Sequence, residues 1–173
     1  MTVHDPPNSL QPPAGMGLIL DAASAASLVS QWQAAGRTVV FTNGCFDLLH
    51  RGHVEYLARA RALGDCLVVG LNGDESVRQL KGPGRPVVLE LDRAAVLAGL
   101  RSVDVVVIFR DLTAVELVSQ VRPDIYVKGG DWATADRTPP EGAVVAQHGG
   151  QVVFLPYLEG HSTTGLLAKI QQD

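Results

Sequence analysis

The residues with the clearest chemical potential in this chain are two histidines, His50 and His53, three positions apart. They follow a β-branched run that ends in an Asn43-Gly44 turn, and Gly52 lies between them. If a helix begins near His50, both imidazoles lie on one face of its first turn, together with the free amides and the positive end of the helix dipole. Gly52 has no side chain to keep a phosphate group away. The pattern predicts a phosphate site that acts on a nucleoside triphosphate.

The bulk composition fits a small enzyme of one domain. The chain has 173 residues, of which 46% are hydrophobic, and a formal net charge of −4. An acidic chain argues against nucleic-acid binding, and no apolar run reaches transmembrane length. Cys45 and Cys66 form neither a Cys-x-x-Cys pair nor a zinc spacing with histidine, which is typical of reduced thiols. We therefore expect a cytoplasmic protein with no nucleic-acid or membrane partner.

Residues 1–17 are rich in proline and lack the apolar core of a signal peptide, so we expect a flexible tail followed by one domain over 18–173. From residue 18 onward, segments with the apolar pattern of strands alternate with segments that have the helical period. Residues that start or end helices separate them. Strands are expected at 38–42, 66–71, 103–109, 124–128 and 151–155, and helices at 24–35, 52–63, 74–80, 90–100, 113–121, 142–148 and 162–170. The segments 81–86 and 129–140 are expected to be loops.

Short, continuous apolar strands are typical of a parallel sheet covered on both faces. The fold class is therefore α/β, with a Rossmann-like doubly wound parallel sheet of about five strands. In such folds, ligands bind beyond the carboxyl ends of the strands at the switch point. Three polar segments follow strands in this way, namely 42–47, 72–74 and 128–131. They are expected to converge on one site.

Several common chemistries are excluded. The chain has no Gly-Lys dipeptide and hence no Walker A loop, and no Gly-x-Gly-x-x-Gly follows a strand. A Gly-x-Ser-x-Gly elbow, typical of α/β-hydrolases, does not occur either.

The segment 41–53, FTNGCFDLLHRGH, resembles the first conserved motif of the cytidylyltransferase-like nucleotidyltransferases. Further segments agree in order: VGLNGD at 69–74, LKG at 80–82 with RPV at 85–87, VKGGDW at 127–132, and EGHSTT at 159–164. The resemblance extends from Leu18 to the C-terminus and is nearest to the D-glycero-β-D-manno-heptose 1-phosphate adenylyltransferase branch.

That branch transfers AMP from ATP to the heptose 1-phosphate and gives ADP-heptose and pyrophosphate for the lipopolysaccharide inner core. The resemblance implies the same reaction here, with magnesium accompanying ATP and a homodimer as the assembly. Many relatives are fused to a sugar kinase. Because this sequence has no kinase-sized segment, a separate heptose kinase and phosphatase are expected to supply the substrate.

The resemblance also implies roles for individual residues. His50, His53 and Lys81 would be catalytic, and Asp47 would lie on the acceptor side. The residues implied to bind nucleotide or phosphate are Thr42, Asn43, Gly44, Cys45, Phe46, Gly52, Asn72, Arg85, Arg93, Lys128, Gly129, Gly130, Asp131, Ser162, Thr163 and Thr164. No metal ligand is assigned directly.

Some of these residues could instead have a purely structural role. Lys81 could be a solvated loop lysine, and Arg93 an ion-pair residue on a helix surface. Ser162 could simply cap a helix, which is compatible with phosphate binding. Asp47 could orient the loop or the acceptor rather than bind a metal ion. His161 adjoins the last motif and receives no role.

The reaction has alternatives as well. Glycerol-3-phosphate cytidylyltransferases often carry an arginine shortly before the Ser-Thr-Thr segment, whereas this chain has none after Arg137. This difference favours the heptose branch. Another alcohol-phosphate nucleotidyltransferase of that kind, or a non-catalytic nucleotide sensor, stays open.

Overall fold

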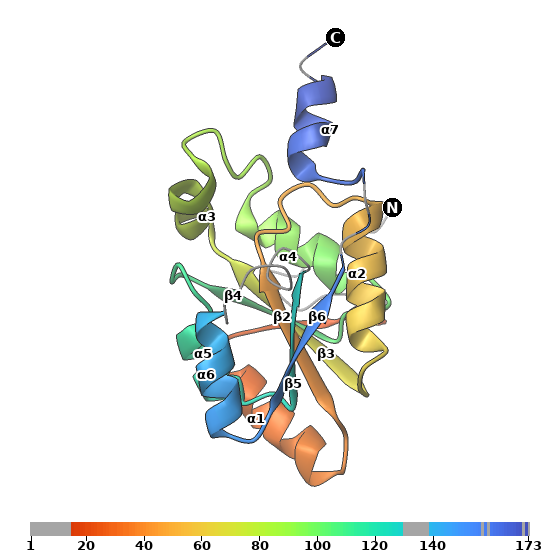
Figure 1. The fold of residues 1–173 in the computed structure, drawn as a ribbon, viewed down its shortest axis with the longest axis vertical. Helices are drawn as coiled ribbons and strands as arrows, with labels where there is room; N and C mark the ends of the chain where they lie inside the picture. Colours follow the sequence, from red (N-terminus) through yellow and green to blue (C-terminus); the bar gives the residue numbers. More distant parts are fainter. Residues whose placement is uncertain (1–14, 130–138, 157, 159, 171, 173) are drawn as a thin grey trace, which may run out of the picture.

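The computed structural model describes residues 15–129, 139–156, 158, 160–170 and 172 (Figure 1). Most of the expected tail, like Gly130 and Asp131 of the expected site, lies outside these residues. The described elements are β1 (Leu18–Leu20), α1 (Ala22–Ala34), β2 (Val39–Gly44), α2 (Arg51–Arg61), β3 (Cys66–Asn72), α3 (Asp74–Lys81), α4 (Glu90–Ala98), β4 (Val105–Phe109), α5 (Val115–Val121), β5 (Ile125–Gly129), α6 (Pro140–Gln147), β6 (Gln151–Leu155) and α7 (Thr163–Ile170).

The strands form one parallel sheet in the order β1-β4-β3-β2-β5-β6. From β2 the chain first builds outward through β3 and β4, and then returns to add β5 and β6 on the other side of β2. The strand order therefore reverses between β2 and β5, which makes their carboxyl ends the switch point of the fold.

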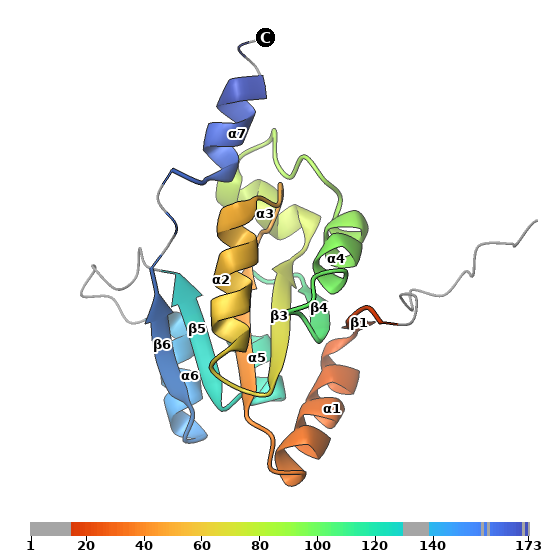
Figure 2. The ribbon, with the colours of Figure 1, turned by 90° about the vertical axis from the view of Figure 1, so that its right-hand side faces the viewer.

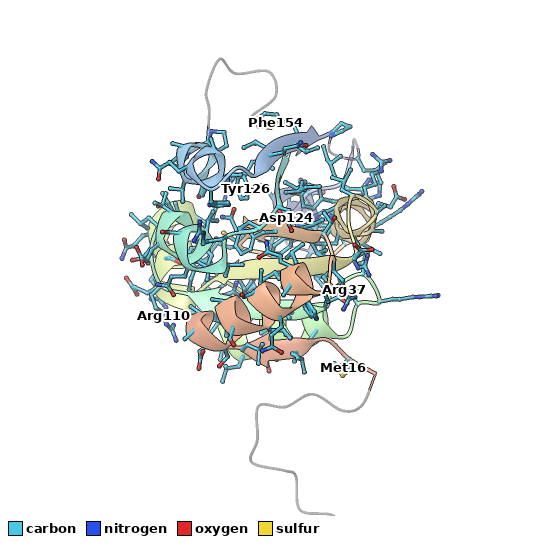
Figure 3. The ribbon with its side chains drawn as sticks, turned by 90° about the horizontal axis from the view of Figure 1, so that it is seen from below. Met16, Arg37, Arg110, Asp124, Tyr126 and Phe154 are labelled. Atoms are coloured by element: carbon cyan, nitrogen blue, oxygen red, sulfur yellow. The ribbon has the colours of Figure 1, made fainter. Side chains whose placement is uncertain are left out.

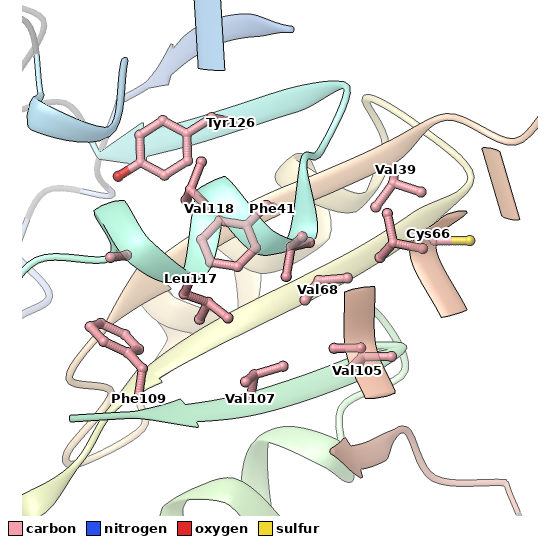
Figure 4. Packing of buried hydrophobic residues seen from close by; sticks show 14 of the residues in the cluster. Val39, Phe41, Cys66, Val68, Val105, Val107, Phe109, Leu117, Val118 and Tyr126 are labelled. Atoms are coloured by element: carbon pink, nitrogen blue, oxygen red, sulfur yellow. The ribbon is translucent and has the colours of Figure 1, made fainter. Parts of the chain in front are cut away.

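Helices cover both faces of the sheet because alternate residues of each strand point to opposite sides. The apolar cluster in Figure 4 joins one face of the sheet to α1, α5 and α6, through residues such as Phe41, Val68 and Leu117. A second cluster joins the other face to α2 and α4, through residues such as Val69 and Leu97. The inner strands β2, β3, β4 and β5 are largely buried on both sides, which explains their continuous apolar sequences.

The α/β class and the doubly wound parallel sheet are confirmed. The expectation of about five strands was wrong by one, because β1 was missed. β1 has only three residues and lies at the sheet edge, where it pairs with β4 alone. So short a run gives almost no periodicity to detect.

The carboxyl ends of the strands lie at one end of the molecule. Figure 2 shows α7 projecting from this end, beyond α2 and α3. Within the described residues, no helix combines the length and apolar character needed to cross a membrane.

Candidate active site

A cavity of about 580 Å³ opens at the carboxyl ends of β2 and β5, at the switch point. Among the described residues, most of those expected at the site line it: Asn43, Gly44, Cys45, Phe46, Asp47, His50, Gly52, His53, Lys81, Arg85, Lys128, Gly129, Ser162, Thr163 and Thr164. The strand-end segments 42–47 and 128–129 therefore meet around one hollow, as predicted, together with residues more than a hundred positions away in sequence, whereas the expected segment 72–74 does not line it.

A second cavity of similar volume, about 590 Å³, lies at the opposite end of the sheet. Its lining includes Gln33, Arg122, Asp124 and His148, and none of the residues expected at the site. Figure 3 views the molecule from this end, with Asp124 labelled. The motifs therefore single out the first cavity as the candidate site.

The two histidines lie at the N-terminus of α2. His50 is the N-cap residue, and the two imidazole rings stack with their centroids 3.9 Å apart and their planes at 23°. On the other side of His53, the ring of Phe46 packs edge-on at 5.3 Å. Stacking of this kind fixes both rings beside the amide groups of the first helical turn, where an anion is stabilised.

Both imidazoles are held neutral in the structure. Burial, followed by the nearby His50, lowers the pKa of His53 to about 4. Burial and then His161 lower the pKa of His50. Among the described residues, the Nδ1 atom of His50 is buried without a hydrogen-bond partner, whereas the backbone of Leu48 interacts with the His53 ring and partly opposes the fall of its pKa. A neutral imidazole keeps one N–H group, which an anion in the cavity could accept.

Gly52 allows this close packing. A Cβ atom at position 52 would lie 3.0 Å from the His50 ring atoms Cε1 and Nδ1, and 3.1 Å from the His161 Cβ. The glycine therefore brings the helix start close to His50 and to the segment that carries His161. This is a steric role in addition to the phosphate access expected from the sequence.

The turn after β2 is held from behind by Arg93. The Arg93 guanidinium donates to the carbonyl oxygens of Cys45 (2.5 Å), Asn72 (2.9 Å) and Val88 (2.8 Å), and to the Asp74 carboxylate (2.7 Å). Arg93 is only 2% exposed and does not line the cavity. Arg93 thus does form an ion pair, with Asp74, but its guanidinium is buried rather than on a helix surface. The hydrogen bonds of this arginine are made inside the protein, to the loops that border the site.

Two other expected residues also lie outside the cavity lining. Thr42 is buried, and its hydroxyl bonds to the Val127 carbonyl (2.9 Å) and the Tyr56 hydroxyl (2.7 Å). Asn72 is buried, and its amide nitrogen donates to the Ser76 hydroxyl at 3.3 Å. These side chains join neighbouring elements beneath the site.

Asp47 anchors the glycine-rich loop that follows α3. Its carboxylate accepts hydrogen bonds from Arg85 Nε and from the backbone amides of Val87 (2.8 Å) and Val88 (3.0 Å). Asp47 is 3% exposed, and the same loop begins at Lys81, the last residue of α3. These contacts match the alternative in which Asp47 orients the loop.

Ser162 and Thr163 bring the N-terminus of α7 to the cavity. The Ser162 hydroxyl accepts from the Gly165 amide at 3.0 Å, as a helix cap does, and Thr163 donates to the Leu48 carbonyl at 3.4 Å. Both residues also line the cavity, so capping and a place beside a bound phosphate coexist.

Cys45 lines the cavity, but its thiol is not activated. Burial raises the pKa of the Cys45 thiol, although the positive charges of Lys81, Arg93 and Arg85 oppose this effect. The group stays protonated near neutral pH and is a poor nucleophile. Its backbone, in the turn after β2, matters more than its sulfur.

The sequence did not point to Tyr56, Leu158 or His161 as lining residues. Tyr56 could have been found, because it lies one helical turn after His53 on the same face. The positions of His161 and Leu158 at the cavity depend on tertiary structure, and no periodicity of the sequence predicts them.

Comparison with known proteins agrees with this geometry. The model of the cytidylyltransferase-like family matches residues 41–154. Proteins called bifunctional protein HldE are 48% identical over 153 residues in Wolinella succinogenes, 52% over 160 residues in Mesorhizobium japonicum, and 49% over 162 residues in Streptomyces coelicolor. The matches cover 88%, 92% and 91% of this chain, but only 31%, 32% and 35% of those proteins. The chain thus spans about a third of the length of these relatives.

A solved structure also matches, the lipopolysaccharide core biosynthesis protein from Thermoplasma volcanium. It has a TM-score of 0.57 and 28% sequence identity, and the match covers 73% of this chain and all of that one. The family model spans most of the present chain, including the stacked histidines and the turn after β2. The chain therefore belongs to the cytidylyltransferase-like family and is a nucleotidyltransferase.

Proposed function

We propose that this protein transfers AMP from ATP to D-glycero-β-D-manno-heptose 1-phosphate, giving ADP-heptose and pyrophosphate for the lipopolysaccharide inner core. Three observations support the proposal: the heptose-branch motifs, the identity of about 50% to bifunctional HldE proteins, and the likeness to a lipopolysaccharide core biosynthesis protein. The observation that carries it is the stacked pair His50 and His53 at a helix N-terminus, opening on the switch-point cavity.

In this mechanism, an oxygen of the sugar phosphate attacks the α-phosphorus of ATP. A new P–O bond forms to that oxygen, the bond between the α-phosphorus and the bridging oxygen to the β-phosphate breaks, and pyrophosphate leaves. The sugar phosphate is already anionic, since its second pKa is about 6, so the reaction needs no general base. What the protein must supply is alignment and stabilisation of the developing charge.

The cavity offers groups suited to that task. The neutral imidazoles of His50 and His53 would donate to the α- and β-phosphates, beside the amides of the turn after β2. Lys81 and Arg85, on the loop held by Asp47, would close over the phosphates. Hydroxyls and amides at the α7 N-terminus would contact the remaining phosphate oxygens.

Magnesium is proposed to enter with ATP. The described residues contain no group of three His, Cys, Asp or Glu side chains that could hold a metal ion. The cavity carboxylate Asp47 is occupied by three hydrogen bonds. These residues therefore do not form a cage for the ion. Mg²⁺ is commonly bound largely through substrate phosphates, where it would neutralise charge on the leaving pyrophosphate.

The proposal extends to the setting of the enzyme. We expect a homodimer in the cytoplasm, supplied with substrate by a heptose kinase and a phosphatase. Analytical ultracentrifugation tests the assembly, and a stable monomer at micromolar concentration would contradict the dimer.

The decisive experiment is pyrophosphate release with magnesium, with ATP or CTP paired against the heptose 1-phosphate or glycerol 3-phosphate. We expect release with ATP and heptose 1-phosphate alone, and ADP-heptose in the mass spectrum. Release with CTP or glycerol 3-phosphate would instead assign a cytidylyltransferase of that kind. ATP binding without release in any pairing would assign a nucleotide sensor.

A further inference from the structure

Four polar side chains from three elements meet at one wall of the cavity, and we call them the β2–β5 polar cluster. They are Asn43 on β2, Tyr126 and Lys128 on β5, and Glu141 on α6. Lys128 Nζ lies 3.2 Å from Asn43 Oδ1 and 3.0 Å from the Tyr126 hydroxyl, which lies 2.7 Å from Asn43 Oδ1. Asn43 and Lys128 line the cavity, whereas Tyr126 and Glu141 lie behind them.

Glu141 is the unexpected member of the cluster, because it is a carboxylate that is 2% exposed. Its Oε1 accepts a hydrogen bond from the Ala114 amide at 2.9 Å. Its Oε2 lies 4.0 Å from Lys128 Nζ, and the Tyr126 hydroxyl also interacts with this carboxylate. A buried carboxylate is costly unless an opposite charge compensates it, and Lys128 supplies that charge.

The hydrogen bonds of the cluster fix the orientation of Asn43. An ammonium group only donates, so the Asn43 atom beside Lys128 must be the carbonyl oxygen. The Tyr126 hydroxyl accepts from Lys128 and gives its single proton to the same oxygen. Figure 4 shows the Tyr126 ring within the apolar cluster and its hydroxyl pointing away from the labelled apolar side chains. The planar amide of Asn43 therefore has its nitrogen turned away from these two donors.

The charge of Lys128 depends on its neighbours. Burial lowers the pKa of the Lys128 ammonium, whereas the Glu141 carboxylate and, less strongly, Cys45 raise it. Tyr126 also faces the ammonium, but burial and then Glu141 raise the pKa of its hydroxyl. Tyr126 thus stays neutral. Glu141 is the carboxylate of the cluster, and it stabilises the charged form of Lys128.

We propose that Glu141 is a positioning residue for the transfer reaction, which holds Lys128 as a cation at the cavity wall and thereby presents the Asn43 amide nitrogen to the bound nucleotide. The inference rests on the proposed function for the identity of the reaction. The effect of Glu141 on Lys128 does not depend on that function, because it rests on the distances between the side chains of the cluster. Glu141 touches no substrate and acts through Lys128.

The first test measures the charge of Lys128 directly. The chain has only three lysines, Lys81, Lys128 and Lys169, so ¹³Cε-labelled lysine gives three resonances, and Lys128→Arg identifies the one to follow. Glu141→Gln keeps an oxygen for the Ala114 amide and removes the charge. We expect the pKa of Lys128 to fall by about one pH unit in this variant. The matched control Glu116→Gln, at an exposed position of α5, should leave it unchanged. An unchanged pKa of Lys128 in Glu141→Gln would overturn the proposal.

The second test asks whether this charge matters to the reaction. In Glu141→Gln, the alkaline limb of the pH profile of kcat/KM for ATP should move to lower pH by the same amount as the pKa of Lys128, so that activity is lost at high pH and little is lost at pH 6. Glu141→Asp, which keeps the charge, should restore part of the loss. A purely structural role would lower Tm and reduce activity equally at every pH, and that result would also overturn the proposal.

The two proposals can fail separately. If the wild-type chain binds ATP but transfers nothing, the proposed reaction is wrong. The pH dependence of ATP affinity in Glu141→Gln then replaces the kinetic profile. If transfer occurs and Glu141→Gln matches the wild type at every pH, the reaction stands and the role of Glu141 is wrong.

Discussion

Arg85 donates its Nε–H to the Asp47 carboxylate across 38 positions of sequence, and this pair joins the turn after β2 to the glycine-rich loop after α3. The Asp47 side chain is fully buried and that of Arg85 is 16% exposed. The same carboxylate receives two backbone amides of the loop. One residue of the histidine motif thereby fixes the position of Arg85 in another motif.

Asp47→Asn should therefore impair catalysis through the loop. The amide keeps an oxygen for the Val87 and Val88 amides but loses the charge that holds Arg85. We expect kcat/KM for ATP to fall by about a hundredfold, because small displacements of aligned groups are costly. Steady-state kinetics measures this, with Asp92→Asn at an exposed position of α4 as the control. Equal activity of the two variants would show that the anchor has no effect on the site.

His53→Ala should lower turnover while the protein stays folded. The imidazole is proposed to donate to charge that develops on the phosphates, and deleting a comparable donor costs roughly 3 kcal/mol, or about a hundredfold. Pyrophosphate release gives the rate, and circular dichroism tests the fold. His148→Ala is the matched control, because His148 contacts the Pro123 carbonyl at the opposite end of the sheet. Near-normal turnover of a folded His53→Ala protein would remove His53 from the mechanism.

The low pKa of His53, about 4, also predicts how stability depends on pH. The unfolded chain takes up a proton at this side chain near pH 6.5, whereas the empty folded site does not until about pH 4. Between these values the unfolded state binds more protons, so the free energy of unfolding decreases as the pH falls. The stability that results from keeping His53 neutral is therefore complete above pH 6.5 and is lost as the pH falls toward 4.

Urea denaturation at pH 7 and pH 5 measures that dependence. His53→Gln cannot take up the proton, so its free energy of unfolding should change less between the two pH values than that of the wild type. An identical change in the two proteins would show that His53 is not held neutral by its surroundings.

The sequence predicted every described strand except β1, and it predicted that the ends of β2 and β5 converge, because both features depend on local patterns. β3 and β4 are continuous apolar runs, and the polar residues that follow β2 and β5 reach one edge in any parallel sheet. The environments of Arg93 and Glu141 could not be predicted. Charged residues in helices normally face solvent, and their burial depends on tertiary partners distant in sequence, namely the Cys45 carbonyl and Lys128.

Gly52→Ala tests whether the histidine pair needs its tight packing. The new methyl group would lie 3.0 Å from the His50 ring and 3.1 Å from the His161 Cβ, so His50 must shift. Alanine is otherwise favourable within a helix, so the expected result is a stable protein with impaired catalysis. We expect kcat/KM for ATP to fall at least tenfold, since alignment at the phosphate is lost.

Gly99→Ala is the matched control, because its methyl group would meet its nearest neighbours, Met16 Cε and the Val96 carbonyl oxygen, at an ordinary 3.4 Å. Its kinetics should equal those of the wild type. Thermal denaturation of both variants separates a loss of folding from a loss of alignment. If Gly52→Ala is folded and fully active, the stacked geometry of His50 is not required for the reaction, and the donors would then be the backbone amides of the turn after β2.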